Sequence, residues 1–386
     1  MFRPSRLFLT IGLLAVILTA CGPAASASPT PDMNFVMTQA VQTAMAGMIT
    51  PTPLPTETPL PTATMSPRTP PALPPTFSTN ILNPLDTPHT YMSDTCQYLQ
   101  DKWNPNNAVP GTVVMVVMFH SISKDKATDA NQISAADHRK LMNDLHDMGF
   151  QAINMQQLAD FLYKNAKIPQ RSVLLVVDDR HFASYFNDHF RPYWEQWGWP
   201  VVNAYIAKDE RPDLWAENAA LAAEGWVDYQ AHGVVHNINM DDSSSDEYLT
   251  GELQGSITNL QKYLNKMPIA IIWPGGSFGV RPVQFARKFG YELGFTVNPR
   301  GPVMYNWIPQ GDQKDPARPS YIPEGPVGDP LMTLPRYWDV DARAHLDDVR
   351  VLGQEAAAYA EQNKATELEY YDIMCAPTYG SISAAQ

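Results

Sequence analysis

The chain has 386 residues, a formal net charge of −13 at pH 7 and 35 prolines that are unevenly distributed. This length allows one large domain or two small ones. The acidic balance argues against a nucleic-acid-binding surface, so we expect no nucleic acid among the partners.

The N-terminus predicts export. Arg3 and Arg6 precede an apolar run over residues 7–18, which is too short for a comfortable membrane span and is typical of a signal peptide. The small residues before Cys21 resemble a bacterial lipoprotein signal, so residues 1–21 are predicted to be a signal peptide ending at the lipidated cysteine. The alternative is an ordinary secretory signal with a chance cysteine. We expect an extracytoplasmic protein that lipid on Cys21 anchors to the cell membrane.

A Pro/Thr-rich segment follows the signal. We assign residues 22–95 to a disordered linker, because the composition of residues 50–88 favours extended polyproline conformations and cannot build a core. Fully extended, this spacer would reach about 100 Å. Residues 96–386 are predicted to form the globular domain.

Cys96 and Cys375 lie near the two ends of that domain. An exported compartment permits a disulfide between them, which would stabilise the fold by about 5 kcal/mol in the chain-entropy model. Two unpaired thiols are the alternative.

Strands and helices alternate through the domain, which indicates βα units, a parallel sheet and, with seven or so units, a distorted barrel. Residues 299–334 have no period and many Pro and Gly, so they are predicted to be a long surface insertion. The predicted strands are 112–120, 150–153, 172–178, 201–206, 227–231, 270–273 and 293–297. The predicted helices are 135–148, 155–165, 182–197, 214–224, 246–266, 282–289 and 342–362.

Polar residues follow three of these strands, at the edge of a parallel sheet where ligands bind. Asp178 and Asp179 end the most apolar strand, and His232 and His236 follow a later one. Two histidines at i and i+4 face the same way if that segment is helical. Two imidazoles and one carboxylate form a three-ligand set that leaves a position open on a catalytic divalent metal. Alone, each pair is also common as a solvated loop or by chance.

The order of these motifs resembles the polysaccharide deacetylase family, also called the NodB-homology domain or carbohydrate esterase family 4. That family carries T-F-D-D-G, then H-[ST]-x-x-H, then R-x-P-[FY]-G, and this chain has VVDDR, HGVVH and IWPGG over most of the globular part. The resemblance implies a deformed (β/α) barrel. It implies Asp178 as general base and Asp179, His232 and His236 as ligands of a divalent metal. Zinc is the default ion, and cobalt or nickel would also fit.

The chain departs from the family pattern at several points. Arg180 replaces a glycine beside the carboxylates, where a cation would depress the pKa of Asp178. Ile272 replaces the arginine that orients the base in the family. Arg180 or Arg336 could take the place of that arginine; the alternative is that each is only a surface or structural cation. The turn at Pro274 and Gly275 lacks the family's aromatic, yet its backbone N–H could face an oxyanion; a simple tight turn is the alternative.

The general acid is the least defined residue. The family's last motif, L-x-H, has no clean match, and His345 is the one histidine left after residue 297. Its place at the start of a predicted helix favours a structural or exposed side chain. His120, at the end of an early strand, is a second candidate, and His181 could also approach. Trp273 and Trp338 are placed to stack on a sugar.

The resemblance implies a hydrolase that acts on carbon–nitrogen bonds other than peptide bonds and removes acetyl groups from an N- or O-acetylated cell-surface or extracellular polysaccharide. The other function in view is a carbohydrate-binding lipoprotein on the same fold with weakened catalysis, which Arg180, Ile272 and the missing L-x-H favour. Release of acetate separates the two.

Overall fold

The structure is a computed structural model of the whole chain, and it describes residues 37–38, 41–42, 44, 68–236 and 238–382. The chain divides into two units, Met1–Ser66 and Pro67–Gln386. The described residues of the first unit are helical. The predicted signal peptide and Cys21 lie outside the described residues. Within the described part of the chain, no helix is long and apolar enough to cross a membrane.

One parallel sheet organises the second unit. Its strands follow the order β10-β9-β8-β7-β6-β2-β12, and β5 adds to one end of β6. The strands are β2 (Val113–Phe119), β5 (Gln151–Ala152), β6 (Arg171–Asp178), β7 (Val201–Tyr205), β8 (Val227–Ala231), β9 (Ala270–Ile272), β10 (Leu293–Phe295) and β12 (Tyr337–Trp338). β2 and β6 are buried along nearly their whole length, as their unbroken runs of Val, Leu and Met predict.

Residues 334–338 close this sheet into a deformed barrel. Leu334 bridges to Phe295 of β10, its N–H donating to the carbonyl of Gly294 over 2.8 Å, while β12 pairs with β2 on the other side. Alternate side chains of each strand enter two separate cores, one inside the barrel and one between the strands and the helices. The predicted (β/α) barrel is therefore confirmed.

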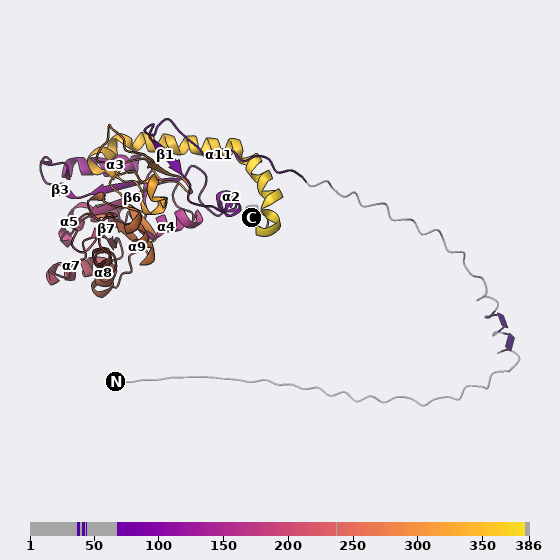
Figure 1. Cartoon of the computed structure of the whole chain (residues 1–386), viewed down its shortest axis with the longest axis horizontal. Helices are drawn as coiled ribbons and strands as arrows, with labels where there is room; N and C mark the ends of the chain where they lie inside the picture. The colour runs from indigo at the N-terminus through magenta and orange to yellow at the C-terminus, as the bar shows by residue number, and fades with distance from the viewer. Residues whose placement is uncertain (1–36, 39–40, 43, 45–67, 237, 383–386) are drawn as a thin grey trace, which may run out of the picture. The chain divides into compact units, whose positions relative to one another are not determined.

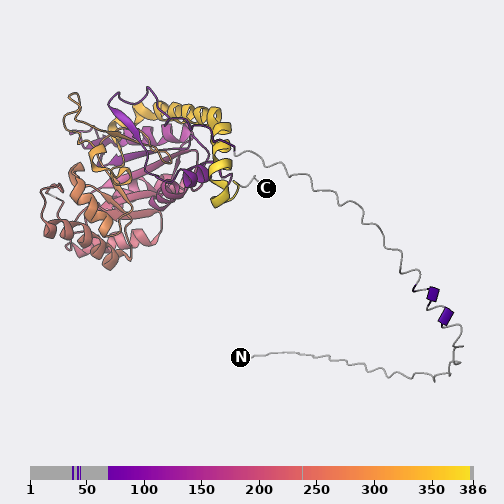
Figure 2. The same ribbon diagram turned by 45° about the vertical axis from the view of Figure 1, so that its right-hand side comes forward.

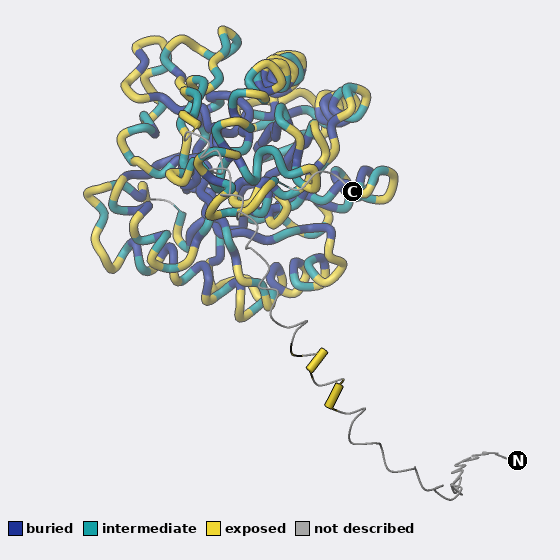
Figure 3. Tube along the Cα trace, turned by 90° about the vertical axis from the view of Figure 1, so that its right-hand side faces the viewer, coloured by how far each residue is buried: buried dark blue, intermediate teal, exposed yellow. Residues whose placement is uncertain are grey.

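Helices surround the barrel, and the exposed residues gather on their outer faces, around buried strands (Figures 1 and 3). The prediction of a single helix over residues 182–197 was wrong, because the chain forms two helices there, separated at Phe190. The helices are α2 (Thr95–Trp103), α3 (Ala135–Asp147), α4 (Met155–Lys164), α5 (Ala183–His189), α6 (Arg191–Trp197), α7 (Pro212–Ala223), α8 (Asp246–Leu264), α9 (Val280–Lys288), α10 (Asp339–Ala342), α11 (Leu346–Met374) and α12 (Ala376–Tyr379).

Part of the expected linker belongs to the folded unit. β1 (Asp86–His89) pairs antiparallel with β11 (Ile308–Gly311), inside the segment predicted to be an insertion without regular structure. Asp86 is buried and accepts hydrogen bonds from Arg300 and Arg318, each over 2.8 Å. These long-range ion pairs bind the two segments together, which composition alone could not reveal. Two short strands, β3 (Ser121–Ser123) and β4 (Gln132–Ser134), form a separate parallel pair.

The long helix α11 runs along one side of the unit to α2 (Figures 1 and 2). It ends at Cys375, which forms a disulfide with Cys96 in α2, as predicted. Leu99 and Tyr371 pack around this bridge as a small third core. The bridge closes a loop of 279 residues in sequence separation and holds the two ends of the folded unit together.

Replacing both cysteines with alanine (C96A/C375A) is expected to lower the free energy of unfolding by up to about 5 kcal/mol, because the unfolded chain regains the entropy of an open loop. Denaturant unfolding measures this loss. A reducing agent should destabilise the wild type by a similar amount and leave the variant unchanged. An unfolding midpoint of the wild type that does not respond to the reductant would contradict the bridge.

Candidate metal centre

The candidate site forms where β6, β8 and β2 end. Because side chains alternate along a strand, Asp178 and His232 fall in register with the residues that point inside the barrel. His120, which follows β2, has the same parity. Asp178 and His232 are 1% and 2% exposed, so they lie deep in the mouth of the barrel. The ring Nε2 atoms of His120 and His232 lie 3.6 Å and 4.0 Å from Oδ2 of Asp178.

Asp179 reaches the same place by an unusual backbone turn. Strict alternation would point it away from Asp178, but its φ of 75° lies in the left-handed region. This conformation costs a non-glycine residue of order 1 kcal/mol or more, so the surrounding structure must hold it. The turn brings Oδ1 of Asp179 to 3.8 Å from Nε2 of His232 and 3.6 Å from Nε2 of His236.

The loop that carries the two histidines is not helical, contrary to one condition of the prediction. Gly233 and His236 both have positive φ, at 76° and 67°. The carboxylate of Glu252 in α8 accepts hydrogen bonds from three successive backbone N–H groups, of residues 234, 235 and 236, over 2.8, 2.8 and 3.3 Å. A side chain on Gly233 would collide with Glu252. Glu252 therefore fixes the conformation of this loop, and in that conformation both imidazoles point into the site.

The ring nitrogens are arranged as metal ligands require. His232 donates from Nδ1 to the carbonyl of Ile272 over 2.8 Å, which leaves the Nε2 lone pair facing the site. Burial lowers the pKa of His232 to about 4, against the opposing effect of Asp178, so this ring is neutral at physiological pH. Nε2 of His236 lies 3.0 Å from Nε2 of His232. Two facing ring nitrogens at this distance need a shared proton or cation between them.

A divalent ion fits this donor set. The ligand atoms of Asp179, His232 and His236 all lie within 4.8 Å of one another. Two imidazole nitrogens and one carboxylate oxygen match a three-ligand catalytic site with an open position. The sequence predicted all three residues.

Asp178 is held by an arginine from the segment that closes the barrel. Arg336 is fully buried and donates from Nη1 to Oδ1 of Asp178 over 2.7 Å, and from Nε to the carbonyl of Thr296 over 2.7 Å. Burial by itself raises the pKa of Asp178, but Arg336, with His232 and His120, outweighs it and lowers the pKa to about 2. Of the two arginines considered as substitutes for the motif arginine, Arg336 is the one that pairs with Asp178. Arg180 instead pairs with Glu210 over 2.7 Å.

The remaining candidate catalytic residues lie at different distances from the centre. Pro274 and Gly275 lie in η1 (Pro274–Gly276), and Pro274 packs beside Gly233 of the histidine loop. His345, in η4 (Arg343–His345), is not brought to the centre: its contacts among the described residues are Asp348 at 3.4 Å and the ring of Tyr337. It lies on the helical segment after β12, not at a strand end. Of the other two candidates for the acid, His120 lies beside the carboxylate of Asp178, and Nε2 of His181 lies 3.0 Å from the backbone carbonyl oxygen of Asp178.

The two tryptophans also differ. Trp338 is half-buried and its ring stacks on His120, with centroids 5.5 Å apart. Trp273 is fully buried and donates to the carbonyl of Met332, so the prediction that it could stack on a sugar was wrong. Its parity along β9 turns it into the core between sheet and helices.

Sequence reasoning missed Glu252. A usable signal was present, because Glu252 falls on the helical face of α8 that otherwise carries Leu249, Leu253, Ile257 and Leu260. A carboxylate on an apolar stripe must find buried partners, and here the partners are backbone N–H groups.

Comparison with known proteins found similarity to one family over the segment that carries this site. Residues 165–294 match the family model described as polysaccharide deacetylase. YxkH of Bacillus subtilis (strain 168), a protein assigned to the polysaccharide deacetylases, is 22% identical over 187 residues, which cover 48% of this chain and 64% of YxkH. This chain thus spans less than two thirds of that relative.

Two of the solved structures that are similar to this chain are the following. The deacetylase PplD of Streptococcus pyogenes, solved with acetate, has a TM-score of 0.46 at 20% identity and covers 58% of this chain and 92% of its own. IcaB of Ammonifex degensii has a TM-score of 0.46 at 15% identity and covers 64% of this chain and 100% of its own.

The matched segment contains both aspartates, both histidines and the Pro274 turn. On the family match and the order of these motifs, residues 165–294 are similar to the polysaccharide deacetylase family, as the resemblance of the motifs predicted.

Proposed function

We propose that this protein is a metal-dependent hydrolase that removes acetyl groups from an N- or O-acetylated cell-surface or extracellular polysaccharide. The observation that carries the proposal is the meeting of Asp179, His232 and His236 around one point, with Asp178 alongside. Zinc is the ion that this ligand set favours, and cobalt or nickel would also fit. A divalent ion bound there supplies Lewis acidity, which polarises a carbonyl and lowers the pKa of water to about 7.

The protein's own groups divide the proton transfers between them. Arg336 holds Oδ1 of Asp178, so Oδ2 is the oxygen left to accept a proton from the attacking water. His120 donates a proton to the leaving nitrogen or oxygen, because its ring lies beside Asp178 and Trp338 holds it by stacking. We assign the backbone N–H of Gly275 to the oxyanion of the tetrahedral intermediate. In this arrangement Arg336 stands in for the motif arginine and His120 for the histidine of the missing L-x-H motif.

We also propose that the protein works outside the cytoplasm, anchored by lipid on Cys21 after removal of residues 1–21, with the linker as a spacer. The Cys96–Cys375 disulfide supports this location, because such bridges persist in oxidising compartments. The weakened-catalysis alternative loses two of its arguments, since Arg336 pairs with Asp178 and Arg180 pairs with Glu210. Acetate release from acetylated chito-oligomers or acetylxylan, with zinc supplied, tests the function directly.

The purified protein is expected to bind one zinc ion per chain. Replacing His232 with alanine should weaken binding by at least about 100-fold, because one of three ligands is lost, and E252Q by about 10–100-fold, because the loop loses its anchor. Metal analysis and a competition titration measure both. H345A is the matched control and should bind zinc like the wild type. Equal zinc affinity in H232A and the wild type would rule out this centre.

Asp178→Asn is expected to lower acetate release by about 100-fold or more while zinc stays bound, because the proton acceptor is removed but the three ligands remain. H120Q should cause a loss of similar size if His120 is the acid. Initial rates and metal content are measured on the same samples. Acetate release by D178N at the wild-type rate would refute the assignment of Asp178 as the base. A wild-type protein that binds glycan but releases no acetate would favour the alternative function, a carbohydrate-binding lipoprotein with weakened catalysis.

Arg336→Met tests the source of the low pKa. Without the guanidinium, burial raises the pKa of Asp178, so the acid limb of kcat/KM against pH should move upward by about 1–3 pH units. The wild type should lose no base through protonation of Asp178 until the pH approaches 2. R180M, in which the other arginine is changed, should keep the wild-type profile. An unmoved limb in a folded R336M protein would show that Arg336 does not control the base.

A further inference from the structure

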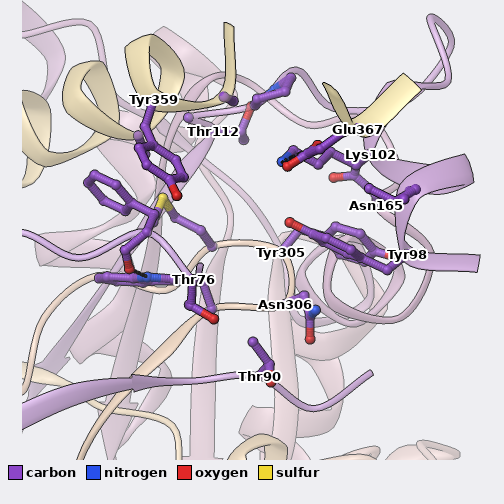
Figure 4. Close-up of a pocket in the computed structure, with 18 of the residues that line it drawn as sticks. Thr76, Thr90, Tyr98, Lys102, Thr112, Asn165, Tyr305, Asn306, Tyr359 and Glu367 are labelled. Atoms are coloured by element: carbon purple, nitrogen blue, oxygen red, sulfur yellow. Dashed lines mark hydrogen bonds and ion pairs between the residues drawn. The ribbon is translucent and has the colours of Figure 1, made fainter. Parts of the chain in front are cut away.

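A cavity lies far from the metal centre. It has a volume of about 160 Å³ and includes Gly111 and Thr112, just before β2, whereas the metal centre lies past the other end of that strand. Seven strand residues separate the two by about 23 Å. Its walls come from residues 73–77, α2, α11 and the loop 304–307 (Figure 4).

Aromatic rings form two facing walls of this cavity. Tyr98 and Tyr305 stack at 5.9 Å on one side, and Tyr359 lies on the other (Figure 4). Tyr359 contacts Phe77 at 5.6 Å, and Phe77 contacts Trp307 at 5.9 Å.

These rings are fixed by hydrogen bonds to the backbone of the entering segment. The hydroxyl of Tyr359 donates to the carbonyl of Pro75 over 2.7 Å, and Nε1 of Trp307 donates to that of Phe77 over 2.9 Å. The rings of Tyr359 and Trp307 are therefore preformed, with their faces rather than their polar atoms available to a ligand.

A buried amide faces the cavity with unused donors. Asn306 is 7% exposed, and its Oδ1 accepts hydrogen bonds from the backbone N–H groups of Tyr91 and Met92 over 2.8 and 2.9 Å. Its Nδ2 has no partner among the described residues. The hydroxyl of Tyr98 also lacks a partner there, and both residues line the cavity (Figure 4). Neither of these two atoms is among the fully buried polar atoms that lack a partner, so both are accessible to a ligand oxygen.

The charges in the lining cancel. Lys102 and Glu367 are the charged residues among the described ones that line the cavity, and they pair with each other over 2.7 Å. Glu367 also accepts from Nε1 of Trp103 over 2.7 Å, so its capacity is occupied. A charged ligand would find no unpaired counter-charge here. The lining therefore suits a neutral ligand with a ring-shaped body and hydrogen-bonding groups around its edge.

We propose that this cavity binds one pyranose unit of a neutral sugar. The two faces of the ring lie against the aromatic walls, and ring hydroxyls accept from Nδ2 of Asn306 and bond with the hydroxyl of Tyr98. The volume suits a single ring, because it is well below that of sites for drug-sized ligands. The proposal uses none of the residues of the metal centre and does not depend on catalysis.

The test is calorimetric titration of the full H232A protein with glucose and N-acetylglucosamine, because this variant keeps the cavity while its metal centre is disabled. Binding with a Kd of about 1 mM is expected. Adding N306D, which keeps the acceptor for Tyr91 and Met92 but removes the free donors, should weaken binding about tenfold, as should adding Y98F.

Tyr163→Phe, in the same background, is the matched control, because that hydroxyl donates to Glu292 outside the cavity; it should leave binding unchanged. Thermal unfolding verifies that each variant is folded. No binding of either sugar at concentrations about tenfold above the expected Kd would overturn the proposal. So would binding that N306D and Y98F leave unchanged. Acetate release by the wild type is a separate measurement and bears only on the metal centre.

Discussion

The buried ion pair between Arg336 and Asp178 links the closure of the barrel to the chemistry of its mouth. Arg336 lies between Leu334, which bridges to β10, and Tyr337, which pairs with β2, so its side chain is placed by the closing segment itself. Both groups are almost completely buried, and a buried charge without its partner is strongly destabilising. Closure of the barrel is therefore energetically favourable only when Asp178 is ionised and forms an ion pair with Arg336. The same contact keeps one oxygen of the candidate base in a fixed orientation.

The metal ligands depend on a second buried carboxylate. Glu252 gathers three backbone N–H groups of the histidine loop, which stabilises positive φ values that a non-glycine residue otherwise avoids. The loop therefore does not need helical geometry to bring His232 and His236 together. Asp179, directly after β6, adopts a similarly costly conformation. Unfavourable backbone conformations on two segments that meet at the candidate site are typical of a functional site, because the surrounding structure must hold them.

The cation beside Asp178 comes from a part of the chain that the motif resemblance does not indicate. Ile272 stands where the family has its arginine, and it contributes its side chain to the inner core and its carbonyl to His232. The cation comes from Arg336 instead, which lies 64 positions later in the sequence but on the adjoining part of the barrel. Several strand ends meet near Asp178. A cation carried by any of them can therefore pair with this carboxylate.

The sequence alone determined the α/β class, the parallel strands and the three metal-ligand candidates, because hydrophobic periodicity and motif order are local signals. It also indicated the Cys96–Cys375 pair. Tertiary structure decided the rest: that Arg336 and not Arg180 pairs with Asp178, that His120 and not His345 lies beside it, and that residues 68–95 belong to the folded unit. Each of these depends on segments far apart in the chain meeting across a closed barrel. Spacing along a sequence carries no measure of such distances, because they arise only when the strands pair.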